Sequence, residues 1–192
     1  MVTMTTPDLW LSQDQPVTVE DLRNMPEDEF RYELDDGILI VSPAPSRRHQ
    51  LVTTRLAVIL TAACPQDLAV VVSVGVAVSR LQYREPDLAV VGGDALDKDH
   101  EDEPPLLAVE VASPRTRLYD RNRKKDVYEA FGIPSYWIVE PDRDAPRLIV
   151  LELRDGKYEQ VADVTGDDQF RATLPYAVTI RPSVLVRTGP LD

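Results

Sequence analysis

A strand, a helix and a second strand follow one another in the second half of the chain, and this succession limits the possible folds. The strand-like run Leu106–Ala112 is apolar on both faces, which is typical of a central strand. The helix predicted over Tyr119–Phe131 ends at Gly132, and a strand resumes over Tyr136–Glu140. Because so short a crossover returns the chain in the same direction, it predicts two parallel neighbouring strands in one sheet.

Shorter elements surround this crossover. Thr18 with Asp21 predicts the start of a short helix, and Ser46 caps a helix that runs to about Ala63. Hydrophobic alternation and turn residues predict strands at residues 30–34, 38–41, 68–73, 74–79, 87–91, 148–153, 157–161, 169–172 and 176–180. We therefore expect an α/β fold of the α+β kind, with a central mixed β-sheet flanked by helices and with extra antiparallel hairpins.

Composition argues against several classes of function. The formal net charge of −12 opposes general attraction to nucleic acid or to an anionic membrane, so such binding needs a local basic patch. No apolar run reaches the roughly 18 residues of a membrane span, and no membrane partner is expected. The only cysteine, Cys64, cannot form an internal disulfide, which fits a cytoplasmic location. With two histidines and one cysteine in the chain, a closed zinc site is not expected.

A local basic patch is present within residues 115–125, where a single acid, Asp120, accompanies the basic residues Arg115, Arg117, Arg121, Arg123, Lys124 and Lys125. Arg47 and Arg48 open the predicted helix that follows Ser46. The patch has two interpretations. It could bind an anion such as a nucleic-acid backbone, or it could be a solvated helix with paired charges, which the i, i+4 pair Lys125 and Glu129 supports.

Two charged residues interrupt apolar surfaces that lie close together in the sequence. Lys124 falls on the apolar helical face of Tyr128 and Phe131, and Glu110 is the one acid within the central strand. Because lysine and glutamate are almost never fully buried unless they are paired, these two residues predict a shared polar site. The alternative is an ion pair that only stabilises the fold or makes it specific.

Asp87 opens the predicted strand 87–91 and supplies a second acid. If this strand neighbours the central one, Asp87 and Glu110 can converge at one end of the sheet. Two carboxylates held together repel each other unless a proton or a cation intervenes, and oxygen ligands suit Mg²⁺. Lys124 could then offset negative charge or orient an attacking water molecule.

Several sequence blocks carry a resemblance to a known family. In order, they are YELDDG at 32–37, SPAP at 42–45 before His49, REPDLAVV at 84–91, EVASP at 110–114, YDR at 119–121 with RK at 123–124 and Tyr128, and GIPSYWIV at 132–139. Their ordered succession resembles a bacterial putative restriction-endonuclease domain family of the PD-(D/E)XK phosphodiesterase superfamily. The resemblance covers roughly residues 18–185.

The resemblance implies a restriction-endonuclease-like nuclease core. Asp87 and Glu110 match the metal-binding acids, and Glu33 matches an additional acid from the N-terminal part. The superfamily's usual lysine lies two residues after the second acid, where this chain has Ala112. Lys124 matches the family's lysine on the following helix, a known variation within the superfamily.

These assignments predict a metal-dependent endonuclease that acts on nucleic acid, with DNA expected, and uses Mg²⁺ or Mn²⁺. Asp87, Glu110 and the Val111 carbonyl would hold the ion, with Lys124 and Glu33 as further catalytic residues. Candidates for contact with nucleic acid are His49, Arg47, Arg48, Arg115, Arg117, Arg121 and Arg123. A homodimer would supply one site for each strand of a duplex, and no organic cofactor is expected.

Residues 18–185 are expected to form a single domain, with a poorly ordered extension at 1–17 and a tail at 186–192. An alternative function remains, a non-catalytic module that keeps the nuclease fold and binds nucleic acid or protein. The acidic composition favours this alternative, whereas Asp87, Glu110 and Lys124 together favour an enzyme. Glu33 could instead be a charge at a hairpin edge, and His49 a polar neighbour of the core.

Overall fold

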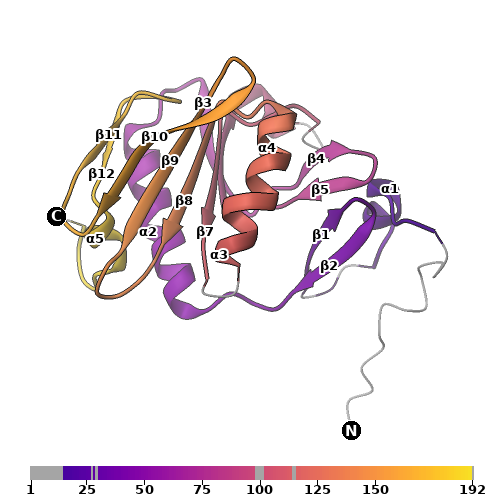
Figure 1. The fold of residues 1–192 in the computed structure, drawn as a ribbon, viewed down its shortest axis with the longest axis horizontal. Helices are drawn as coiled ribbons and strands as arrows, with labels where there is room; N and C mark the ends of the chain where they lie inside the picture. The colour runs from indigo at the N-terminus through magenta and orange to yellow at the C-terminus, as the bar shows by residue number, and fades with distance from the viewer. Residues whose placement is uncertain (1–14, 27, 29, 98–101, 114–115, 192) are drawn as a thin grey trace, which may run out of the picture.

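The computed structural model describes residues 15–26, 28, 30–97, 102–113 and 116–191. Within these residues a larger and a smaller β-sheet form the framework, with helices around them (Figure 1). A ribbon of β11 (Phe170–Ala172) and β12 (Val178–Ile180) accompanies the larger sheet. No helix in the described part of the chain is long and apolar enough to cross a membrane.

The larger sheet contains the predicted crossover. Its strand order is β10 (Lys157–Thr165), β9 (Arg147–Arg154), β8 (Ser135–Glu140), β7 (Leu107–Val111), β6 (Leu88–Gly92) and β3 (Leu68–Val72). β7 and β8 are parallel, whereas the other neighbours in this sheet are antiparallel. The predicted parallel pair and the mixed sheet are thus confirmed.

The smaller sheet has the order β2 (Ile38–Ser42), β1 (Arg31–Asp35), β5 (Gln82–Arg84) and β4 (Val76–Ser79), and α1 (Val19–Arg23) precedes it in the chain. The β1–β2 turn needs glycine at position 37 for two reasons. Gly37 has a φ of +80°, and a Cβ atom there would lie 2.5 Å from the Pro16 Cβ. The turn therefore fixes the hairpin and the side-chain alternation along β1.

Helices cover both faces of the larger sheet (Figure 1). On one face lies α2 (Arg47–Ala63), which contacts α5 (Pro182–Val186). The other face carries one helical stretch formed by α3 (Arg117–Tyr119), a π-helical segment (Asp120–Lys124) and α4 (Lys125–Phe131). This stretch ends at Gly132, which has the left-handed φ of +87°. A 3₁₀ turn (Gly93–Asp97) follows β6.

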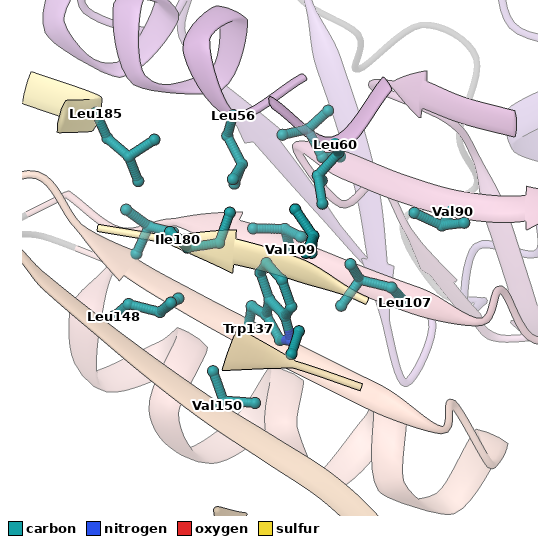
Figure 2. Close-up of a cluster of buried hydrophobic side chains, with 14 of the residues drawn as sticks. Leu56, Leu60, Val90, Leu107, Val109, Trp137, Leu148, Val150, Ile180 and Leu185 are labelled. Carbon is teal, nitrogen blue, oxygen red and sulfur yellow. The ribbon is translucent and has the colours of Figure 1, made fainter. Parts of the chain in front are cut away.

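Successive side chains of β7 point to opposite faces of the larger sheet, so one face of the strand contributes to the core under α2 and the other to the polar site. Leu107, Val109 and Val111 join the apolar cluster under α2, whereas Ala108 joins the cluster on the α4 face. Figure 2 shows the α2 side, where Leu56 and Leu60 lie over the strands that carry Val109 and Trp137. Glu110 has the same parity as Ala108, so the strand period directs it towards α4. The polar site therefore lies on the α4 face.

Most expected elements are present, and the differences have local causes. The helix predicted between Ser46 and about Ala63 is present as α2, in which Leu56 and Leu60 are fully buried and the last residue, Ala63, is exposed. β5 and α5 were not predicted from the sequence. β5 contains only three residues, two of them polar, and α5 starts at Pro182 within a segment too short to show helical periodicity.

Candidate active site

β1 presents three alternating charged side chains to the α4 face of the molecule. Arg31 Nη1 lies 2.7 Å from Asp87 Oδ1, and Glu33 Oε1 accepts a hydrogen bond of 2.9 Å from Lys124 Nζ. Asp35 Oδ1 accepts a hydrogen bond of 2.8 Å from Arg123 Nε. Because alternate residues of a strand share a face, β1 contacts Asp87 through Arg31 and the helical stretch that carries Lys124 through Glu33 and Asp35.

Lys124 joins two acids that come from different sheets. Its Nζ donates to Glu110 Oε1 over 2.8 Å as well as to Glu33 Oε1, and all three side chains are buried. The hydroxyl of Tyr128, one helical turn after Lys124, donates to the same Glu110 oxygen over 2.7 Å. The predicted partnership of Glu110 and Lys124 is therefore present, and Glu33 completes it.

Asp87 is held by three groups from three different elements. Its Oδ2 accepts the Val111 backbone N–H over 2.7 Å and lies 2.9 Å from His49 Nε2, while its Oδ1 faces Arg31. His49 reaches this place because Ser46 caps α2 through the His49 backbone N–H. The structure thus brings together Asp87 and Val111, and it adds His49 at their side.

Burial and neighbouring charges shift the pKa values of the buried groups, some upwards and some downwards. Burial opposes ionisation of Asp87, but the hydrogen bond to His49 and the charge of Arg31 outweigh it and hold the pKa at about 2. Burial raises the pKa of Glu110, and the nearby Lys124 charge offsets only part of that effect. Burial acts on Glu33 too, yet there the Lys124 charge prevails and lowers the pKa. Lys124 itself keeps a raised pKa despite its burial, because Glu110 and Glu33 surround it.

Lys124, which contacts Glu110 of β7, lies in the π-helical segment before α4. π-helical turns occur often at functional sites and widen the helix locally. Lys124 is the last residue of that segment, and the preceding Arg123 is tied to Asp35 of β1. Asp35 is fixed in turn by the fully buried Arg84, whose Nη2 lies 2.7 Å away. β1 therefore holds the segment through Asp35 and Lys124 through Glu33.

A cleft of about 290 Å³ opens beside Asp87, and Arg31, His49 and Glu85 also line it. Glu110 and Lys124 do not line this cleft and lie buried beyond Asp87. Two apolar residues, Phe30 and Val72, stand at the wall of the cleft and remain about half exposed. An acidic centre is thus accessible from one side.

The predicted basic patch is largely occupied by the protein's own acids. Arg117 and Arg121 both pair with the buried Glu140, and Arg123 pairs with Asp35. Arg47 and Arg48 are exposed at the start of α2, near the cleft residue His49, whereas Arg115 lies outside the described residues. The interpretation as a helix with paired charges therefore fits Arg117, Arg121 and Arg123, and their contact with nucleic acid remains a prediction.

Sequence reasoning missed Arg31 and Glu85, and it placed Tyr128 on the apolar face of the helix without giving its hydroxyl a role. Tyr128 does pack in the core, but its hydroxyl also fixes Glu110. Arg31 could have been found from the alternation of β1, since it lies two residues before Glu33. Glu85 gives no comparable signal, because its N–H contact with Glu33 depends on the pairing of β1 with β5.

The oxygen ligands suit a hard divalent cation such as Mg²⁺, which needs only one or two carboxylates besides water and substrate phosphate. Both hydrogen bonds that the described residues give to Glu110 end on Oε1, which leaves Oε2 without one. No group of three or more His, Cys, Asp or Glu side chains within the described residues is arranged to hold a metal ion by itself. The ligand chemistry fits, and further ligands would come from water and substrate.

Comparisons with known proteins identify a family and a similar fold. The model of the Uma2 family, described as "putative restriction endonuclease", matches residues 19–182. The fold is similar to a crystal structure of a putative nuclease belonging to DUF820 from Anabaena variabilis, with a TM-score of 0.65 and 16% identity. That match covers 83% of this chain and 90% of the other. No curated protein matches the chain.

Proposed function

This chain belongs to the Uma2 family of putative restriction endonucleases, and we propose that it is an endonuclease that hydrolyses phosphodiester bonds in DNA with Mg²⁺ or Mn²⁺. One observation carries the proposal. Asp87 and Glu110, two acids at adjacent strands, lie in one buried network with Lys124, as a two-acid-plus-lysine site requires.

The charges of the site support the need for a cation. Four acids, Glu33, Glu85, Asp87 and Glu110, surround the two cations Arg31 and Lys124. Negative charge is in excess when all four acids are ionised, and also when Glu110, whose pKa is raised by burial, is protonated and the other three are ionised. A phosphodiester is itself an anion and would be repelled from such a centre. A divalent ion held by Asp87 and Glu110 would reverse this repulsion, polarise the phosphate and activate water.

The residues of this chain have separate tasks in the proposed reaction. Lys124, held beside Glu110, would orient the attacking water or offset charge that develops on the phosphate. Tyr128 and Glu33 position Glu110 and Lys124 through the hydrogen bonds described above. His49 and the Val111 N–H fix Asp87. Cleavage of both strands of a duplex calls for two such sites, which a pair of copies would supply.

A second candidate is a non-catalytic module that binds nucleic acid or protein. The observation that favours it is the internal pairing of the network, since Lys124 contacts two acids and Arg31 contacts Asp87. A network so paired could persist for stability alone.

The test compares wild type with Asp87→Asn. Mg²⁺ and Mn²⁺ are titrated into each protein by calorimetry, and each is then incubated with supercoiled plasmid. We expect binding and metal-dependent nicking by wild type, and loss of both in Asp87→Asn. Asp163→Asn is the matched control, because Asp163 pairs with Arg147 on the β9–β10 hairpin and should leave both properties unchanged. Absence of binding by wild type, even with DNA or RNA present, would support the non-catalytic module.

A further inference from the structure

Arg31 lies among four acids of the site. Its Nη1 contacts Asp87 Oδ1 at 2.7 Å, its Nε lies 3.6 Å from Glu85 Oε1, and its Nη2 lies 3.9 Å from Glu33 Oε1. Glu110 also acts on it electrostatically and, with the other acids, raises its pKa in spite of burial. The positive charge of Arg31 therefore reduces the repulsion between these acids.

The hydrogen bonding of Arg31 is incomplete for a residue in that position. Nε and Nη2 are buried and have no hydrogen-bond partner among the described residues. A guanidinium offers five N–H donors, and buried donors left without partners are uncommon because each costs free energy. The guanidinium thus offsets the negative charge of Glu33 and Glu85 without forming hydrogen bonds to either.

The two oxygens of Asp87 differ in what they can give a metal ion. Oδ2 already accepts the Val111 N–H and contacts His49, so its lone pairs are used. Oδ1 contacts Arg31. An ion that binds Asp87 without breaking the backbone contact must therefore bind Oδ1, where it would lie beside the positively charged guanidinium and be repelled by it.

We propose that Arg31 is a resident counter-ion of the metal site, which holds Asp87 Oδ1 while no divalent cation is bound and yields that oxygen when one binds. The inference deepens the proposed function and rests on it. Movement of Arg31 is sterically feasible, because its side chain is 23% exposed and lines the cleft. A guanidinium displaced into the cleft would meet the phosphate of a bound nucleic acid, a partner that suits its planar array of donors.

The first experiment is a calorimetric titration of Mn²⁺ and Ca²⁺, without nucleic acid, into wild type, Arg31→Gln, Asp87→Asn and Arg187→Gln. We expect Arg31→Gln to bind the ions at least about tenfold more tightly than wild type, since a competing charge-assisted hydrogen bond is gone. Arg187→Gln is the control for loss of one positive charge. Arg187 pairs with Asp167 beyond α5 and should show wild-type affinity.

Two failures can be told apart. Wild-type binding that Asp87→Asn abolishes, combined with equal or weaker binding by Arg31→Gln, would overturn the role of Arg31 and leave the proposed function in place. If neither wild type nor Arg31→Gln binds an ion, even when the titration is repeated with DNA present, the metal site itself is wrong and the role of Arg31 falls with it.

A second measurement needs no variant and covers the case in which Arg31→Gln does not fold. Wild-type crystals are grown with Mn²⁺, and the ion is located by anomalous scattering. We expect the ion on Asp87 Oδ1 and Arg31 Nη1 beyond hydrogen-bond distance from that oxygen. An ion on Asp87 with the Arg31 contact intact would refute the proposal.

Discussion

Replacement of Lys124 by methionine tests whether the lysine neutralises the buried acids. Methionine keeps much of the side-chain volume but removes the ammonium that donates to Glu110 and Glu33. Both acids remain buried, so their charges lose a shared partner. In metal-free buffer each acid can become protonated instead, and the free-energy cost of that protonation determines how much the variant lowers the free energy of unfolding.

The cost follows from the pH. Keeping a carboxyl protonated costs about 1.4 kcal/mol for each pH unit above its pKa in the unfolded chain, hence up to about 3.5 kcal/mol at pH 7 and about 1 kcal/mol at pH 5. In wild type the Glu33 pKa is lowered, so Glu33 contributes stability above its unfolded pKa. In the variant the pKa of Glu33 rises above the unfolded value, so stability falls as the pH rises. Because Glu110 already has a raised pKa, Glu33 dominates the difference, and we expect a loss of about 3 kcal/mol at pH 7 and about 1 kcal/mol at pH 5.

Urea unfolding followed by circular dichroism, in EDTA at pH 5 and pH 7, measures this loss. Lys125→Met is the matched control, because Lys125 is the next residue and makes only longer contacts with Asp126 and Glu129. It should cost less than about 1 kcal/mol at either pH. Adding Glu33→Gln to Lys124→Met should restore most of the loss at pH 7. A penalty for Lys124→Met that is equal at both pH values would refute the reasoning.

Two further predictions concern ion pairs elsewhere in the fold, one beside the site and one between α4 and β10. Asp35→Ala leaves the fully buried Arg84 without its carboxylate and should lower the free energy of unfolding by about 3 kcal/mol. The control is Asp36→Asn, because Asp36 has a φ of +50°, which asparagine adopts more readily than alanine. Loss of its exposed ion pair with Arg123 should cost less than about 1 kcal/mol in the same urea assay. The hydrogen bond from Lys157 holds the pKa of Glu129 at about 2, so the stability it provides is present above about pH 4.5 and is lost as the pH falls towards 2. Glu129→Gln should therefore cost about 1 kcal/mol at pH 6 and little at pH 2.5, and a cost that does not shrink in acid would contradict this.

The strand–helix–strand crossover and the family could be predicted because their signals are local. Val109 and Trp137 occupy continuous apolar runs, and Gly132 marks the helix end, so the parallel β7–β8 pair followed from sequence alone. The match of the family model to residues 19–182 confirms the family inferred from the ordered sequence blocks. Short elements such as β5 were missed because their pairing depends on distant strands.

The sequence indicates candidate residues of the site more readily than the contacts between them. Glu110 and Lys124 were visible as charges in apolar patterns, and their contact is present. Arg31 lies on β1 of the smaller sheet and Asp87 directly before β6 of the larger sheet. The alternation of β1 therefore places Arg31 on the face of Glu33 but does not reveal its contact with Asp87. The same holds for Glu140, which is buried and pairs with Arg117 and Arg121. The sequence left open whether the basic residues were paired and did not indicate this partner.

The place of the lysine on a helix makes the site depend on both sheets. Ala112, where the superfamily's usual lysine would lie, is 3% exposed and packs in the cluster that contains Tyr128, so a longer side chain there would need a rearranged core. Lys124 reaches Glu110 from the other side of that cluster, and Glu33 of β1 takes its second hydrogen bond. A lysine on the strand would need no such support from β1. The smaller sheet is therefore a structural part of this candidate active site, since two residues of β1, Glu33 and Arg31, contact Lys124 and Asp87.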